Sequence, residues 1–276
     1  MSIDKKTLYV TDLDGTLLNT KDRISDFSLQ VMNSLVDRGL LFSYATARSL
    51  SSASIVTKGL SATLPVIVYN GTFLINPVTK EVLSSIGFSK KQTSYLKNIL
   101  EENKIFPLVY SYQEEQEKVS WVWGQETEGM KYYLANREGD RRMTPLSDYQ
   151  KLYQGQVFYI TCIGEKEKLQ PVFEMLKDHS EYNCIFQQEL YRQEYWCEIM
   201  LKNATKAKAI LKLKEITGCE RIVSFGDAIN DLPMFSISDE CYAVENAVEE
   251  LKRAATGIIA SNDKDGLAHW LLENIK

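Results

Sequence analysis

Short apolar runs alternate with segments of helical periodicity at the N-terminal end of this 276-residue chain. Strands are predicted at residues 8–11, 40–45 and 65–69, and helices at residues 25–38 and 48–58. Ser25 is suited to cap the first helix, and Gly39 is suited to end it. Strands this apolar, separated by helices, are typical of a parallel sheet covered on both faces.

The pattern changes between about residues 82 and 195, where the strands become longer and more amphipathic. Helices are predicted near residues 90–102, 126–136 and 166–178. Strands and helices without strict alternation indicate an α+β module with an antiparallel sheet. Trp121 and Trp123 fall on one face of a strand in this module, which favours packing against its helices over stacking on a sugar.

The α/β pattern returns towards the C-terminus, so the middle module is interpreted as an insertion into the first domain. A helix is predicted at residues 204–216, strands at 222–225, 242–244 and 257–260, and a last helix from about residue 264. The expected domains are therefore a discontinuous α/β core of residues 1–83 and 195–276 and an inserted α+β domain of residues 84–194.

Composition narrows the function classes. The net charge of −5 and the isoelectric point near 5.3 argue against a nucleic-acid or anionic membrane partner. No apolar run approaches the length of a membrane span, and the first residues do not resemble a signal peptide. Five scattered cysteines without metal-site spacing are typical of reduced thiols, so a cytoplasmic location is expected.

Four polar clusters follow predicted strands or begin predicted helices. Two aspartates, Asp12 and Asp14, end the first strand, and Thr46 and Ala47 follow the second. Lys206 begins the helix after residue 199, and the stretch 227–231 contains Asp227, Asn230 and Asp231. Each cluster alone has an ordinary explanation as a turn, a helix cap or a solvated lysine. Together they offer a carboxylate nucleophile, oxygen ligands for Mg²⁺ and donors for phosphate oxygens, which is what phosphoryl transfer requires.

These motifs, DLDGT at residue 12, TAR at residue 46, Lys206 and GDAIND at residue 226, resemble in order the four motifs of the haloacid dehalogenase superfamily of phosphohydrolases. The stretches 245–247 and 261–266 look like the tail of its Cof-type (class IIB) branch. The resemblance covers about residues 7–85 and 195–276. It implies a Rossmann-like parallel-sheet core with an inserted α+β cap of the C2B type, and the cap is matched by position and size.

The resemblance also implies a role for each motif residue. Asp12 is the expected nucleophile, and Asp14 is the expected general acid and then base. Mg²⁺ is expected on the Asp12 side chain, the Asp14 backbone carbonyl and Asp227, with Asp231 in the outer shell. The residues expected to bind phosphate are Thr46, Lys206, Asn230 and the backbone amides of Leu13 and Ala47.

The chain departs from the family pattern in two places. Ala47 stands where the family commonly has glycine, and Val244 and Glu245 replace its usual Met-Gly. The first change adds a methyl group to the loop after the second strand, and the second changes the wall next to the site.

The cap is expected to close over the site and select the substrate. Arg137, Arg141 and Arg142 lie in a polar stretch of it and are candidates for binding a second anionic group, although such residues are more often solvated.

The leading hypothesis is a Mg²⁺-dependent phosphatase that acts on small phosphorylated metabolites, sugar phosphates first, through an aspartyl-phosphate. A phosphomutase of the phosphomannomutase type and a catalytically silent binding protein are the alternatives. The sequence leaves the physiological substrate and the oligomeric state open.

Overall fold

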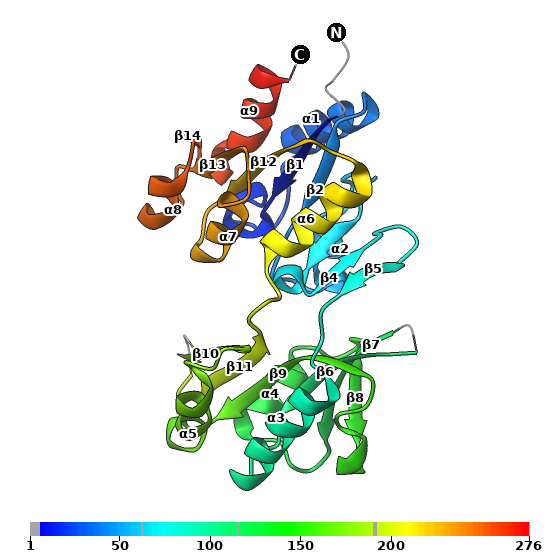
Figure 1. The fold of residues 1–276 in the computed structure, drawn as a ribbon, viewed down its shortest axis with the longest axis vertical. Helices are drawn as coiled ribbons and strands as arrows, with labels where there is room; N and C mark the ends of the chain where they lie inside the picture. Colours follow the sequence, from blue (N-terminus) through cyan, green and yellow to red (C-terminus); the bar gives the residue numbers. More distant parts are fainter. Residues whose placement is uncertain (1–5, 62, 115, 190–191, 276) are drawn as a thin grey trace. The chain divides into compact units, whose positions relative to one another are not determined.

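The computed structural model describes residues 6–61, 63–114, 116–189 and 192–275, and the chain divides into two compact units (Figure 1). The core unit comprises the chain up to Ser85 and from Ala204 onward, and the inserted unit comprises Ile86–Asn203. The boundary expected after residue 194 lies before β11 (Tyr195–Leu201), whereas β11 pairs with β9 (Gln156–Gly164) in the inserted unit. The apolar character of this segment shows that it is a buried strand but does not say which sheet it joins.

The core unit is built on a parallel sheet of five strands (Figure 1). In spatial order the strands are β14 (Gly257–Ile259), β13 (Glu240–Val244), β12 (Arg221–Gly226), β1 (Thr7–Thr11) and β2 (Leu41–Tyr44). All four neighbouring pairs are parallel, so the carboxyl ends of the strands meet at one edge. The predicted α/β core with an inserted α+β module is confirmed.

Helices cover both faces of this sheet because the strand residues alternate between the faces. Leu8 and Val10 pack in a cluster with residues of α6 and α7, whereas Tyr9 faces Trp270 of α9. The helices are α1 (Asp26–Asp37), α2 (Leu50–Val56), α6 (Lys206–Thr217), α7 (Leu232–Phe235), α8 (Glu249–Ala254) and α9 (Gly266–Asn274). Ser25 caps α1 as predicted, accepting a hydrogen bond from the Ser28 amide.

A small antiparallel sheet extends the core unit beside β2. It contains β3 (Val66–Val68), β4 (Phe73–Ile75) and β5 (Val82–Ser85). A single parallel bridge between Ala45 and Ile67 joins it to the main sheet. The segment predicted as a third apolar strand is therefore present, but it pairs antiparallel with β4, whereas the sequence predicted a place in the parallel sheet.

The inserted unit has a six-stranded sheet with helices on its faces (Figure 1). In spatial order its strands are β10 (Tyr182–Gln188), β11, β9, β6 (Leu108–Gln113), β7 (Gln116–Val122) and β8 (Met143–Leu146). All neighbouring pairs are antiparallel except β7 and β8. The helices are α3 (Lys90–Glu102), α4 (Glu128–Ala135) and α5 (Lys166–Leu176).

The two tryptophans of this unit differ in burial. Trp121 is 8% exposed and donates its indole N–H to Glu126, whereas Trp123 is 74% exposed. The prediction that both pack against helices is wrong for Trp123, because β7 ends at Val122. None of the described helices has the length and apolar character that a transmembrane span requires.

Candidate active site

Two neighbouring strands deliver carboxylates to the carboxyl edge of the core sheet. Thr11 and Phe225 are partners in the register of β1 and β12, so Asp12 and Gly226 follow side by side. The Asp12 amide donates to the Phe225 carbonyl at 2.9 Å, which extends the ladder to the site. Carboxylate oxygens of Asp12, Asp227 and Asp231 lie within 4.8 Å of one another. The sheet thus brings together residues that are more than 200 positions apart in sequence.

Lys206 is the buried cation of this cluster. It begins α6, and its ammonium group lies 2.5 Å from Asp12 Oδ1 and 2.7 Å from Asp231 Oδ1. The lysine is 1% exposed. Burial opposes its charged form, but the two aspartates outweigh burial and raise the pKa of Lys206. It is therefore a fixed positive charge and not one of the solvated lysines of the same helix.

Asp231 has both carboxylate oxygens engaged by protein donors. Oδ1 accepts from Lys206, and Oδ2 accepts from the amides of Asp227 and Ala228 at 3.0 and 3.1 Å. A side chain at position 226 would overlap this carboxylate, so Gly226 is required by close approach. The saturated hydrogen bonding suits Asp231 to orient its neighbours, whereas Asp12 and Asp227 keep oxygens for another partner.

Asp12 and Asp227 carry more negative charge than the protein neutralises. Burial raises the pKa of Asp12 to about 7, against the opposing effect of Lys206. Burial also raises the pKa of Asp227 to about 6, against a hydrogen bond of 3.0 Å from Thr16. Two under-compensated carboxylates on adjacent strands are a hard-oxygen donor set, which fits Mg²⁺. A bound cation would favour the ionised form of both groups.

Asp14 lies outside the buried cluster and is held by Arg48. The Arg48 Nε lies 3.0 and 2.9 Å from the two Asp14 oxygens, and Nη2 lies 2.5 Å from Oδ1. Hydrogen bonding to Asp14 raises the pKa of Arg48. The Asp14 side chain is 45% exposed, so it is accessible to solvent or to a ligand. The two aspartates of the first motif therefore occupy different environments, as separate acid and nucleophile roles require.

The predicted phosphate-binding residues have defined surroundings. Thr46 is fully buried and its hydroxyl accepts from the Arg48 amide at 3.1 Å. Asn230 donates to the Asn70 side chain at 3.2 Å. Ala47 is exposed and has no positive φ, so the backbone there does not depend on glycine. The first departure from the family motif is thus accommodated without strain.

Sequence reasoning missed several residues that shape the loop after β1. Arg48 fixes Asp14, and Asn246 donates to the Gly15 carbonyl at 2.7 Å. A Cβ at Gly15 would overlap the Asp227 carboxylate, so this glycine permits the close approach of the two motifs. Asn262 links the same region through two hydrogen bonds that it donates, one from its backbone amide to the Asn246 side chain and one from its side chain to the Leu18 carbonyl. The sequence could have indicated these residues, because they lie within the motif stretches of the chain.

Gly71 packs closely against the backbone at the start of α6, the helix that carries Lys206. Its φ is +101°, and a Cβ there would overlap the Thr205 carbonyl. We expect Gly71→Ala to lower the free energy of unfolding by about 1–3 kcal/mol from backbone strain, with a further cost from the overlap. Urea denaturation measures this change.

Gly218 provides a matched control at the other end of α6. It has a φ of +70°, but a Cβ there would meet nothing within 4 Å. Gly218→Ala should therefore cost less than Gly71→Ala. Equal costs would show that the chain around Thr205 relaxes freely and that Gly71 does not position Lys206.

Comparison with known proteins identifies the family. Residues 9–271 match the family model of haloacid dehalogenase-like hydrolases. The chain belongs to this family. The identification made from the motifs is therefore confirmed, and the chain is an enzyme of this hydrolase class.

Individual relatives are distant but match over nearly their full lengths. The chain is 26% identical to the 5-amino-6-(5-phospho-D-ribitylamino)uracil phosphatase YwtE of Bacillus subtilis, over 94% of this chain and 95% of the relative. It is 24% identical to the phosphatase YitU of the same organism, which is named for the same substrate, over 98% and 97% of the two chains. The crystal structure of TM0651 from Thermotoga maritima is similar, with a TM-score of 0.78, 24% identity and 96% of each chain covered.

Proposed function

We propose that this haloacid dehalogenase-like hydrolase is a Mg²⁺-dependent phosphatase of small phosphorylated metabolites, with sugar phosphates as the first class to test. One observation carries the proposal. The buried Asp12 carboxylate ends β1 beside Asp227 and is paired with the fixed charge of Lys206. A desolvated carboxylate beside cationic groups is suited to attack phosphorus.

The proposed reaction has two displacements at phosphorus. An oxygen of Asp12 forms a bond to phosphorus while the bond to the substrate oxygen breaks, and Asp14 gives its proton to that leaving oxygen. Asp14 then takes a proton from water, whose oxygen attacks the phosphorus and releases Asp12 and inorganic phosphate. Arg48 donates to both Asp14 oxygens, which suits the ionised carboxylate that takes the proton from water.

The phosphate oxygens need donors as charge develops on them. The proposal assigns this task to Lys206, Thr46, Asn230 and the backbone amides of Leu13 and Ala47. Lys206 is the strongest of these, because burial keeps its charge unscreened. Its bonds to Asp12 and Asp231 fix the ammonium group without rotamer freedom.

Mg²⁺ would be held by Asp12 and Asp227, with the Asp14 backbone carbonyl as a further ligand. Asp231 belongs to the outer shell in this proposal, which agrees with its saturated oxygens. When bound, the ion supplies positive charge that neutralises phosphate oxygens during transfer. The raised pKa values of Asp12 and Asp227 support a requirement for this charge.

The names of two relatives guide the choice of substrates. YwtE and YitU are named for a ribityl phosphate that carries an aminouracil ring. This compound belongs in the panel beside sugar phosphates, because the identities of 26% and 24% leave the substrate open.

The described cysteines are all free thiols, which supports the proposed cytoplasmic location.

The test is release of inorganic phosphate across this panel with Mg²⁺. We expect release that stops with EDTA and returns when Mg²⁺ is added in excess, because Asp12 and Asp227 need a counter-charge. Activity that is indifferent to the chelator would contradict the metal assignment. Isomerised sugar phosphate without free phosphate would indicate a mutase, and an unchanged panel would favour a binding protein.

A further inference from the structure

A hollow on the inserted unit lies between α4 and β11. Its volume is about 190 Å³, several times the share of one water molecule. Aromatic rings line it together with charged groups, and aromatic side chains with a few placed polar groups are common in small-molecule sites. The residues that carry the argument are Tyr133, Arg137, Arg192, Glu194 and Trp196.

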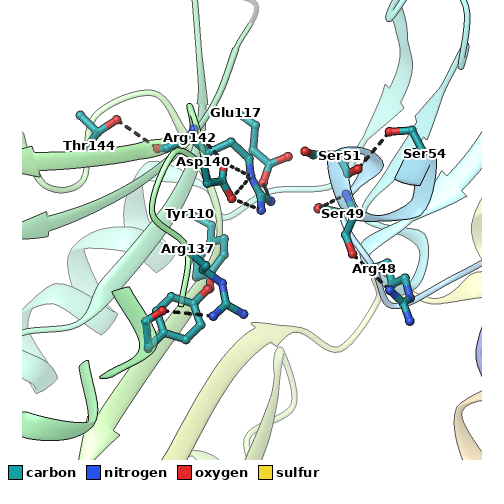
Figure 2. A network of polar contacts seen from close by, with 12 residues as sticks. Arg48, Ser49, Ser51, Ser54, Tyr110, Glu117, Arg137, Asp140, Arg142 and Thr144 are labelled. Atoms are coloured by element: carbon teal, nitrogen blue, oxygen red, sulfur yellow. Dashed lines mark hydrogen bonds and ion pairs between the residues drawn. The ribbon is translucent and has the colours of Figure 1, made fainter. Parts of the chain in front are cut away.

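Arg142 is already neutralised by acidic neighbours, unlike Arg137. Its guanidinium lies 2.7 Å from Glu117 and 2.6 Å from Asp140. Figure 2 shows the three side chains together. These bonds lower the pKa of Asp140. Arg142 therefore holds the turn before β8 together and has little capacity left for a ligand.

Arg137 has a different environment in the same segment. In the described part of the chain it forms no ion pair, and its one hydrogen bond goes to the Tyr133 carbonyl at 3.2 Å. The guanidinium stacks 3.5 Å from the centre of the Tyr133 ring. Figure 2 shows it beside Tyr110, and its charge also helps to lower the pKa of Asp140 without forming an ion pair with it. Most of its donors thus remain available on a half-buried side chain at the hollow.

The Tyr133 ring that supports Arg137 is itself fixed. Its hydroxyl lies 2.6 Å from the Tyr110 hydroxyl, and its ring packs edge-on against Trp196 at 5.4 Å. Because the ring cannot turn freely, the guanidinium plane has a preset orientation. A preset guanidinium loses little conformational entropy when it binds an oxyanion.

The other charged residues that line the hollow already interact with neighbouring groups. Arg192 is paired with Glu194 at 3.0 and 2.7 Å, so these two charges cancel. Glu189 also lines the hollow and has an interaction of its own. Among the described residues that line the hollow, Arg137 is therefore the cation without an ion-pair partner.

We propose that Arg137 binds an organic oxyanion, a carboxylate or a phosphate, in the hollow between α4 and β11. The lining residues all belong to the inserted unit, so the proposal stands apart from the phosphatase function proposed for the core unit.

The experiment compares two anions with a neutral compound of the same carbon skeleton. The anions are gluconate and glucose 6-phosphate, and the neutral compound is glucose. Binding to the full chain is measured by calorimetry in EDTA. We expect Arg137→Gln to weaken binding of at least one anion about tenfold or more, since bonds between charged groups contribute this much. Binding of glucose should change less than twofold.

Two control variants separate the site from general charge effects. Arg141→Gln removes the same charge from an exposed neighbour and should leave binding of both anions unchanged. Arg137→Lys should restore binding only partly, because lysine lacks the planar fork.

The outcomes are distinct. Unchanged binding of both anions to Arg137→Gln overturns the proposal, as does wild-type protein that binds neither anion more tightly than glucose. Loss of anion binding with phosphate release retained supports a site that is separate from the phosphatase site. Loss of anion binding in a protein that releases no phosphate supports the site while the phosphatase proposal fails.

Discussion

Asp12→Asn should reduce phosphate release by a factor on the order of 10⁴ or more while leaving the fold intact. Asparagine has the same shape as aspartate, but its amide is not a nucleophile toward phosphorus. Lys206 keeps its ion pair with Asp231 in this variant, so the buried cation stays compensated. Steady-state kinetics on the best compound of the panel measures the loss, and circular dichroism checks the fold.

Asp37→Asn is the matched control, since Asp37 is exposed at the end of α1 and undergoes the same change of charge. It should retain wild-type kinetics. A phosphoenzyme trapped from the wild type and absent from Asp12→Asn would add direct support. Wild-type turnover by Asp12→Asn would rule out the covalent mechanism.

The motif sites could be predicted because parallel strands place their carboxyl ends at one edge of a sheet. That rule puts Asp12 and Asp227 together without knowledge of the intervening chain. The strong amphipathic pattern of residues 90–102 likewise predicted α3 with its observed ends. Such features depend on local sequence and on one general property of the fold.

Features that depend on particular partners could not be predicted in the same way. The sheet that β11 joins is decided by its hydrogen-bonding neighbours in space, and its apolar pattern suits either unit. Trp123 is exposed because β7 ends one residue before it, and strand ends are weakly marked in sequence. Arg48 lies within a recognised motif, but its hydrogen bonds to Asp14 depend on the geometry of the loops after β1 and β2. The sequence likewise does not show that Arg142 pairs with acidic residues whereas Arg137 stacks on an aromatic ring.

Lys206→Met should be the most destabilising single substitution in the site. It leaves Asp12 and Asp231 buried without their shared cation, and breaking such a pair costs about 3–5 kcal/mol. Phosphate release should fall as well, because a phosphate-binding charge is lost. Urea denaturation in EDTA measures the free energy of unfolding without a contribution from Mg²⁺ binding.

Lys208→Met is the control on the same helix, because Lys208 is exposed and should change stability by less than about 0.5 kcal/mol. A double-mutant cycle with Asp12→Asn then tests the cause. If unpaired carboxylate charge is responsible, Lys206→Met should cost less in the Asp12→Asn background, with a coupling of about 0.5–3 kcal/mol. Equal costs in both backgrounds would mean that Lys206 stabilises the core by packing alone. The short bond to Asp12 would then serve only to hold the ammonium group beside the nucleophile.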